Sequence, residues 1–397
     1  MGIDIAALKT KADAAFEAAV NNKDAPVAGI VAGVTDRNGN IYEGQAGYRN
    51  LETKVPMDQD TLFYFWSTSK AHTAAALLHL YEQGKIDFQD PAKKYVKELE
   101  NVEIFDGFDE SGNLKTRPAK KDITIHHLLT HTAGFGYFFF NDEYREIFEK
   151  TDKCNITQNT IHSISTPLLF EPGEAWNYGA SIDWAGIVLE RVSGMRLGDY
   201  LKKYFYEPLG MNDTKWDRTE ADLARQATHY QRGKDGKLTP LPEIMPLKGE
   251  QHMGGHGAIG TVRDYLKFLR MWLNEGRAPD GTQILKPETV KFGMEPKLTT
   301  QKINNIKTSH PDFSNDVDFP PDADLSWSYG FLVNQGPFPT GRPAGSSFWA
   351  GLANLYYWID IKNGIAGYYA SQVLPFNDVT SAPAFYALEG AVYSSLS

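Results

Sequence analysis

The chain has 397 residues, of which 42% are hydrophobic, and it carries a formal net charge of −10. This length provides for a large buried core, and the 23% of charged residues argues against a chain that is disordered throughout. The acidic balance argues against nucleic acid as a partner, because no basic stretch offsets it.

The N-terminal segment and the cysteine content bear on the cellular location of the protein. The start, Met1-Gly-Ile-Asp, lacks the basic residues and the apolar run of a signal peptide. No apolar stretch is long enough to span a bilayer, so we expect no membrane partner. Cys154 is the only cysteine, so no internal disulfide can form, and we expect a free thiol in the core. These features predict a cytoplasmic protein.

The N-terminal part predicts a helix followed by a hairpin. Apolar residues recur at helical spacing from Ile5 to Val20, which predicts an amphipathic helix. Two strand-like runs, 27–34 and 41–45, flank an Asn-Gly pair, the strongest short signal for a hairpin. An apolar segment then leads into a helix that we expect to begin near Ser67 and to end near residue 84.

The remainder of the chain predicts a helical middle and a second group of strands. Residues 86–250 are mostly helical and irregular in pattern, with the clearest helices near 126–131, 182–194 and 197–206. A helix follows Gly260, the polar stretch 300–325 predicts a long surface loop, and a last helix is expected over 383–395. Strand-like runs occupy 327–333, 352–359 and 365–370.

Strands near both ends of the chain predict one α/β domain that both termini close. We expect this domain to span 1–397, with an α/β part formed by 1–85 and 251–397. Residues 86–250 are expected to form a mostly helical insertion.

Ser67 and Lys70 are candidates for catalysis because they lie three residues apart at the start of a predicted helix. This spacing puts both side chains on one face. A lysine can accept the serine proton only as a neutral amine, so its pKa must fall from about 10.4 toward neutrality. Burial and the positive end of the helix both lower it. From these four residues alone, a helix-capping serine and a surface lysine remain an alternative.

Four segments form an ordered set of motifs around these residues. They read Leu62-Phe-Tyr-Phe-Trp-Ser-Thr-Ser-Lys70, Ile123-Thr-Ile-His-His-Leu-Leu-Thr-His-Thr-Ala-Gly134, Glu171-Pro-Gly-Glu-Ala-Trp-Asn-Tyr178 and Phe348-Trp-Ala-Gly351. Their sequence and order resemble the serine β-lactamase and penicillin-binding-protein superfamily. More narrowly, they are similar to the family VIII carboxylesterases and the fungal lovastatin-type acyltransferases.

The resemblance implies a β-lactamase-like α/β fold, with an antiparallel sheet flanked by helices and a largely helical subdomain. It implies Ser67 as nucleophile, with Lys70 and Tyr178 as the other catalytic groups. The backbone N–H groups of Ser67 and Leu352 would form the oxyanion hole. The implied enzyme is a serine carboxylesterase or transesterase that forms an acyl-enzyme from small to medium esters. An acyltransferase of secondary metabolism and a β-lactamase or D-peptidase are the alternatives.

Two departures from the β-lactamases indicate the substrate. Trp349 stands where they usually carry a cation that binds the drug carboxylate, and Ala180 stands where many carry Asn. Both favour neutral esters with an apolar acyl or alcohol group. We expect a small-molecule ester or thioester as the substrate, with an acyl carrier as a candidate donor. Side chains of this kind are more often part of the core than in contact with a ligand. The candidate pocket walls are Trp66, Tyr137, Phe138, Phe139, Trp176, Trp327, Trp349 and Gly351.

Two other patterns suggest a metal or a cofactor, and we expect neither. His127 and His131 have the i, i+4 spacing of zinc ligands, with His126 beside them, but no carboxylate ligand accompanies them. The stretch 255–260, Gly-His-Gly-Ala-Ile-Gly, matches the dinucleotide fingerprint. It does not follow a hydrophobic strand, so close backbone packing beside the active site explains it better.

Two further hypotheses concern the class of protein. The chain has no Gly-x-Ser-x-Gly elbow, which disfavours an α/β-hydrolase triad. A binding module of the same fold would be expected to have lost Ser67, Lys70 or Tyr178, and all three are present. Their presence favours an enzyme.

Overall fold

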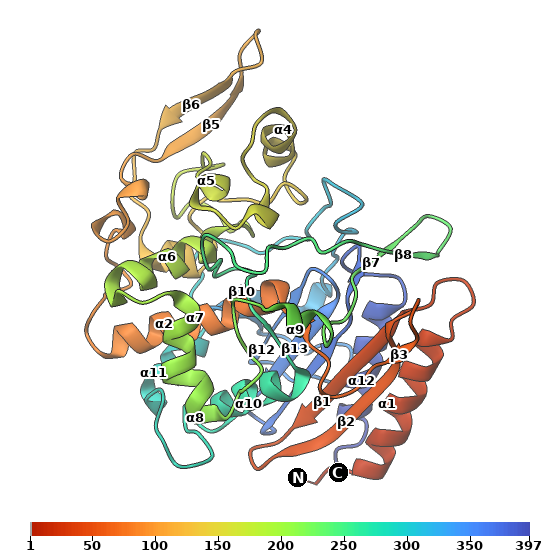
Figure 1. Ribbon diagram of the computed structural model, residues 1–397. Coiled ribbons are helices and arrows are strands. Elements are labelled where there is room, and N and C mark those ends of the chain that lie inside the picture. The colour runs from red at the N-terminus through yellow and green to blue at the C-terminus, as the bar shows by residue number, and fades with distance from the viewer. Residues whose placement is uncertain (1) are drawn as a thin grey trace.

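The centre of the protein is an eight-stranded antiparallel sheet in a computed structural model that describes residues 2–397 (Figure 1). The strand order is β10-β11-β12-β13-β14-β1-β2-β3. Strand β1 pairs with β14 in a register that sets Val31 opposite Ala370, so the two ends of the chain share one sheet. The strands are β1 (Gly29–Thr35), β2 (Asn40–Asn50), β3 (Val55–Pro56), β10 (Leu325–Trp327), β11 (Leu332–Asn334), β12 (Ser346–Gly351), β13 (Leu355–Asp360) and β14 (Ile365–Ala370).

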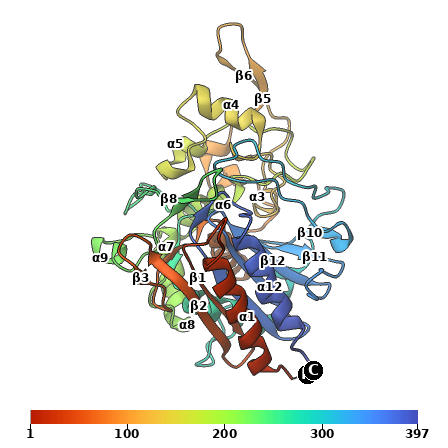
Figure 2. The same ribbon diagram turned by 90° about the vertical axis from the view of Figure 1, so that its right-hand side faces the viewer.

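Helices α1 (Ile5–Val20) and α12 (Ser381–Tyr393) lie side by side on one face of this sheet (Figure 2). The side chain of Asp4 caps α1 by accepting a hydrogen bond from a backbone N–H of its first turn. Phe16 of α1 packs against Tyr369 of β14, with 5.9 Å between the ring centres. The apolar periodicity of the N-terminal segment is therefore the stripe that faces the sheet.

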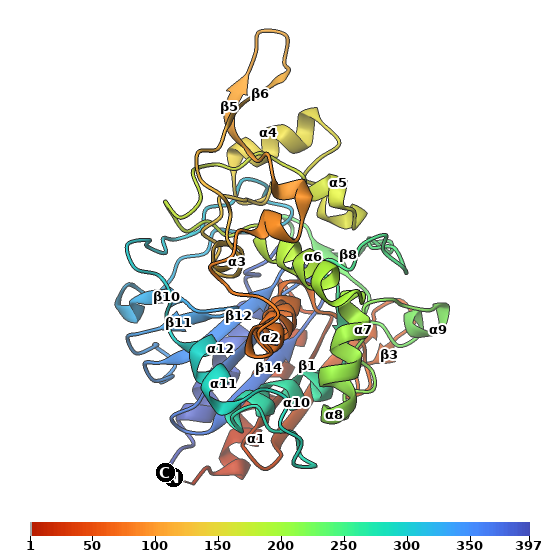
Figure 3. The same ribbon diagram turned by 90° about the vertical axis from the view of Figure 1, so that its left-hand side faces the viewer.

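Helices α2 (Ser69–Glu82) and α10 (Val262–Leu273) lie on the other face (Figure 3). Helix α10 contacts β14 and β1, and its first turn is capped by Thr261, whose hydroxyl accepts from the N–H of Asp264. Helix α2 is buried almost all round, because α6 (Ser181–Ser193) packs against it. Its start, where Ser67 and Lys70 lie, is thus enclosed by protein.

The region 86–250 contains the helices that its pattern predicts and also two hairpins that it does not. One hairpin, β5–β6, projects at the top of Figure 1, and the other, β7–β8, pairs through β7 with β15. The hairpins lack the regular alternation that marks a strand in the sequence. The elements are β5 (Glu103–Phe108), β6 (Leu114–Pro118), α3 (Ile125–Leu129), α4 (Asp142–Lys150), α5 (Ile161–Ile164), α6, α7 (Leu197–Leu201), a π-turn (Lys202–Tyr206), α8 (Glu207–Leu209), α9 (Glu220–Leu223), β7 (Tyr230–Arg232) and β8 (Leu238–Pro240).

The remaining elements are short, apart from α11 (Pro287–Met294). They are β4 (Phe63–Tyr64), β9 (Ile259–Gly260), β15 (Val373–Leu374) and the 3₁₀ turns Trp66–Thr68, Ala92–Lys94, Lys97–Leu99, Ile156–Gln158 and Pro321–Ala323. None of the helices within residues 2–397 combines the length and the apolar composition that a bilayer-spanning helix needs.

Three sequence-based expectations for this region and the core can be compared with the structure. The strand expected over 327–333 is two strands, because the chain turns at Gly330 with a φ of 103°. Strand β12 was not predicted, since its Ser-Ser-Phe-Trp-Ala-Gly sequence lacks β-branched residues. Cys154 is buried, as expected, and burial raises the pKa of its thiol to about 12.

Gly367→Ala tests how tightly the sheet packs beneath α12. A Cβ at this position would lie 2.2 Å from the ring of Trp358 on the adjacent strand, so overpacking should lower the free energy of unfolding by about 1–3 kcal/mol. Gly390→Ala, in α12, is the matched control. A Cβ there meets nothing within 4 Å, and alanine should raise helix stability by roughly 0.5–1 kcal/mol. Chemical denaturation of both variants checks this, and equal effects would contradict it.

Candidate active site

Ser67 lies at a sharp turn between β4 and α2. Trp66, immediately before it, has a φ of 49°, which is unfavourable for a bulky residue. The indole Nε1 of Trp66 donates a hydrogen bond of 3.1 Å to Nε2 of His229, and both side chains are buried. This anchor holds the turn that presents Ser67 at the first turn of a helix, where backbone N–H groups lack helical partners.

Lys70 is completely buried, and its amine contacts three oxygen atoms. Its Nζ donates to Oγ of Ser67 at 3.1 Å, to the hydroxyl of Tyr137 at 2.9 Å and to the carbonyl of Gly255 at 2.9 Å. Burial lowers the pKa of Lys70 to about 7, while the carboxylate of Asp183 acts in the opposite direction. A substantial fraction of the amine is therefore neutral near neutral pH, as a base for Ser67 requires.

Asp183 fixes the segment that supplies one of these contacts. Its Oδ1 accepts the N–H of Gly255 at 2.7 Å, and a Cβ on Gly255 would lie within 3 Å of this carboxylate. A Cβ on Gly254 would likewise lie within 3 Å of the carbonyl oxygen of Ile182. Gly255 thus allows close backbone packing beside Lys70, as the pattern at 255–260 predicts.

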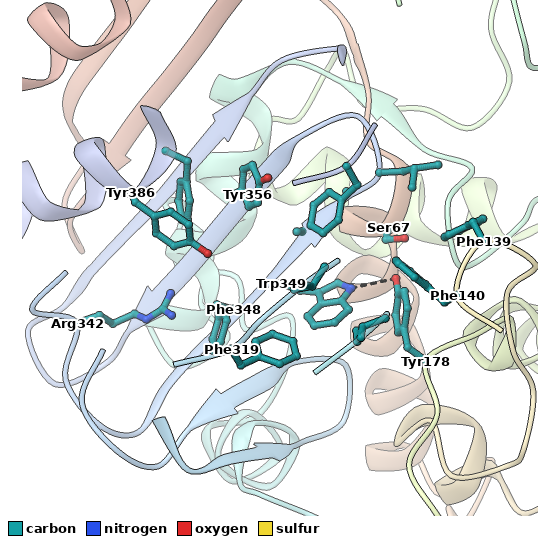
Figure 4. Close-up of a pocket in the computed structure, with 17 residues that line it drawn as sticks. Ser67, Phe139, Phe140, Tyr178, Phe319, Arg342, Phe348, Trp349, Tyr356 and Tyr386 are labelled. Atoms are coloured by element: carbon teal, nitrogen blue, oxygen red, sulfur yellow. Dashed lines mark hydrogen bonds between the residues drawn. The ribbon is translucent and has the colours of Figure 1, made fainter. Parts of the chain in front are cut away.

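Tyr178 completes the group from the other side. Its hydroxyl accepts a hydrogen bond of 3.0 Å from Nε1 of Trp349 on β12 and lies close to Ser67 (Figure 4). Burial raises the pKa of Tyr178, and this effect outweighs the hydrogen bonds from Ser67 and Trp349, which lower it. The side chain of Tyr178 is thus a neutral phenol at neutral pH.

Gly351 brings the end of β12 against the turn that carries Ser67. A Cβ on Gly351 would lie 2.6 Å from the carbonyl of Phe65, so any other residue would push the strand away. Leu352 follows directly and lines the same cavity as Ser67. Ser67 and Leu352 therefore line one cavity, and an oxyanion hole formed by their N–H groups stays a prediction.

A narrow apolar cavity of about 70 Å³ extends from Ser67 along β12 (Figure 4). The loop 300–325 covers it through Ile306, Val317 and Phe319. The other lining residues are Phe139, Phe140, Tyr178, Arg342, Phe348, Trp349, Ala350, Gly351, Leu352, Tyr356, Phe376, Phe385 and Tyr386. A second cavity of about 160 Å³ shares Phe140, Tyr178 and Ile306 with the first.

The structure brings only some of the predicted pocket residues to these cavities. Phe139, Trp349 and Gly351 line the first cavity, and Trp176 lines the second. The remaining candidates are Trp66, Tyr137, Phe138 and Trp327, which line neither cavity. Trp66 turns toward His229 and Tyr137 binds Lys70, so their role at the site differs from that of a pocket wall.

The sequence gives no signal for the particular contacts that several residues make around Lys70. Tyr137 and Gly255 bind the amine of the lysine, and Asp183 binds the N–H of Gly255, from segments that are far apart in the chain. Tyr137 follows the second motif closely, and this proximity is the one available hint. Arg342 has no motif at all.

The three histidines of the second motif have separate structural roles. Nδ1 of His126 is paired with the hydroxyl of Tyr329 at 2.9 Å, and His127 forms a capping box with Thr124. His131 is buried beside the ring of Tyr178. Among residues 2–397, no group of three or more His, Cys, Asp or Glu side chains is placed to hold a metal ion.

The fold and this group of side chains define a serine hydrolase or acyltransferase that works through an acyl-enzyme. The sequence model of the family described as Beta-lactamase matches residues 13–391, so the chain belongs to the β-lactamase family. This finding confirms the resemblance and the fold class that the motifs predict.

Three relatives illustrate the similarity. The ML-236A carboxylate methylbutanoyltransferase mlcH of Penicillium citrinum is 29% identical over 399 residues, covering 97% of this chain and 94% of the relative. The lovastatin esterase of Penicillium rubens is 29% identical over 381 residues, with 91% and 93% covered. The unliganded simvastatin synthase LovD of Aspergillus terreus superposes with a TM-score of 0.83 at 27% identity, covering 99% of each chain.

The burial of Lys70 predicts the pH dependence of ester turnover. Only the neutral amine can accept a proton, so kcat/KM for p-nitrophenyl acetate should rise with pH, reach half of its plateau near pH 7 and then level off. In Asp183→Asn the carboxylate that raises the pKa of Lys70 is lost while an oxygen remains for Gly255, so the midpoint should move to lower pH. A flat profile, or a midpoint that rises in the variant, would contradict this role of Lys70.

Proposed function

We propose that Ser67 is the nucleophile of a carboxylic ester hydrolase or transesterase, with Lys70 as its base and Tyr178 as the proton donor to the leaving group. The observation that carries this proposal is the buried amine of Lys70, which lies 3.1 Å from Oγ of Ser67 with its pKa lowered to about 7. A lysine with the ordinary pKa of about 10.4 would be charged at neutral pH and could not accept the serine proton.

Acylation follows from these positions. Oγ of Ser67 attacks the ester carbonyl carbon, and its proton passes to Nζ of Lys70. The carbonyl oxygen becomes an anion that the N–H groups of Ser67 and Leu352 stabilise. The bond to the alcohol then breaks, and the departing oxygen takes a proton from Tyr178. The ammonium of Lys70, 4.7 Å from the ring centre of Tyr178, restores that proton.

Deacylation reverses the same proton transfers with a new acceptor. Water or a second alcohol loses its proton through Tyr178 and Lys70 and attacks the acyl-enzyme, and Ser67 leaves with the proton of the lysine. Acyl transfer, the second candidate function, is favoured by the two cavities that meet at Tyr178. One would hold the acyl chain and the other, lined by Asn141 and Asn177, would hold an alcohol.

The relatives support the choice of substrate class. Those cited above are named as a methylbutanoyltransferase, a lovastatin esterase and a simvastatin synthase, which supports small acyl groups and alcohols of secondary metabolism. The apolar walls of the first cavity support neutral esters over β-lactams, as does Trp349, which occupies the position where β-lactamases usually carry a cation. We include thioesters, also on an acyl carrier, among the donors.

Ser67→Ala should abolish turnover of p-nitrophenyl acetate and butyrate, with a loss of at least about 10³-fold, because no other group can form the acyl-enzyme. Intact-protein mass spectrometry should show an acyl adduct on the native chain and none on the variant. Ser111→Ala, at an exposed turn, is the matched control and should retain full activity. Turnover that survives in Ser67→Ala would refute the assignment.

The partition between hydrolysis and transfer can be read from one reaction. With an added alcohol, the native protein should form the new ester in competition with the acid, because both acceptors resolve the same acyl-enzyme. Mass spectrometry of the products measures the ratio. If the total rate of p-nitrophenol release rises with alcohol, deacylation limits turnover; acid as the sole product at high alcohol concentration would exclude the acyltransferase alternative.

A further inference from the structure

The cavity that begins at Ser67 ends at a buried cation that the proposed reaction does not use. The side chain of Arg342 is only 1% exposed. Its Nη1 donates to Oε1 of Glu389 at 2.9 Å, while its Nε and Nη2 have no hydrogen-bond partner within residues 2–397. Buried donors without a partner are rare, because each forgoes the hydrogen bonds it would make in water.

The position of the guanidinium restricts where these donors can bind. Its plane packs against the rings of Phe338 and Phe348, whose centres lie 4.0 Å and 3.9 Å away. Only the edge of the group remains for polar contacts. Figure 4 shows this edge at the end of the cavity opposite Ser67, near Tyr386.

Strand β12 sets the distance between the two ends. Gly351 packs against the turn of Ser67, and Phe348, which contacts Arg342, lies three residues earlier on the same strand. Three residues of a strand span roughly 10 Å. An extended acyl chain of about eight atoms covers that length.

The charges at this end favour a neutral ligand. The formal charges of Arg342 and Glu389 cancel. Burial raises the pKa of Glu389, and the charge of a further buried carboxylate, Asp360, adds to this rise. An additional carboxylate would add an uncompensated negative charge to an apolar site. A carbonyl or ether oxygen accepts hydrogen bonds without adding charge.

We propose that Arg342 is a substrate-binding residue that donates hydrogen bonds to a neutral oxygen at the far end of a medium-length acyl chain. This specificity rests on the acylation of Ser67 proposed above. The enzyme then prefers acyl groups that carry a keto or similar oxygen near the terminus over purely aliphatic chains of the same length.

Three matched p-nitrophenyl esters test the specificity: the octanoate, its analogue with a ketone next to the terminal methyl group, and the monoester of octanedioic acid. In the native protein, kcat/KM should be about tenfold higher for the keto ester than for the octanoate, as one charge-assisted hydrogen bond predicts. The octanedioate ester should be the poorest of the three. The acetate ester is too short to reach Arg342, so its rate normalises each protein for active enzyme.

Two variants assign the effect to the arginine. The double variant Arg342→Met with Glu389→Gln removes the donors without leaving an unpaired carboxylate, and the keto preference should disappear. Glu389→Gln alone keeps Arg342 and removes one negative charge, so the octanedioate ester should gain about tenfold relative to the keto ester.

The outcomes separate the two proposals. The proposed role of Arg342, but not that of Ser67, would be overturned if the native protein hydrolyses the acetate ester and shows no preference for the keto ester. A keto preference that persists in the double variant would overturn it as well. If the double variant fails to fold, the native ratio and the Glu389→Gln ratio still decide. Acetate hydrolysis that survives in Ser67→Ala would instead overturn the proposed function.

Discussion

The site depends on the burial of one amine. Lys70 lies on the first turn of α2, enclosed by the sheet, α6 and the segment around Gly255, and water cannot solvate its charge. This enclosure lowers the pKa of Lys70 to about 7, so a substantial fraction of the amine is neutral near neutral pH and able to accept a proton. The charge of Asp183 acts against this shift, so burial and one nearby carboxylate together determine the pKa of the amine.

Close approaches of the backbone build that enclosure. Gly351 lets β12 contact the turn of Ser67, and Gly254 and Gly255 let another segment pack against α6. The strained turn at Trp66 is stabilised by its hydrogen bond to His229. The backbone strain at Trp66 and the small packing contribution of the glycines are thus offset by the large aromatic core around the site.

The sequence predicts the scaffold better than the pocket. The helix from Ile5 to Val20 and the hairpin that follows were confirmed, because their periodicity and the Asn-Gly turn are local signals. The family motifs located the segments of Ser67, Lys70 and Tyr178, which the structure brings together. The catalytic roles of these residues, and the division into 1–85 with 251–397 and 86–250, stay predictions.

The pocket could not be predicted because it depends on contacts between distant segments. Aromatic content alone does not show which ring faces a cavity, so Trp66 and Trp327 were candidates although they line neither cavity. Conversely, Arg342 lines the first cavity from a loop that carries no motif, and Phe348 lies in the fourth motif but was not a candidate for the pocket. The β5–β6 hairpin was missed for a similar reason, since its pairing is clear only in the folded chain.

The most direct test of a Ser67 acyl-enzyme is a crystal structure of the protein after reaction with an alkyl phosphonate ester. The account predicts phosphorus bonded to Oγ of Ser67, a phosphoryl oxygen between the N–H groups of Ser67 and Leu352, and the alkyl chain along β12 toward Arg342. Phosphorus on another residue, or a phosphoryl oxygen directed away from both N–H groups, would contradict it.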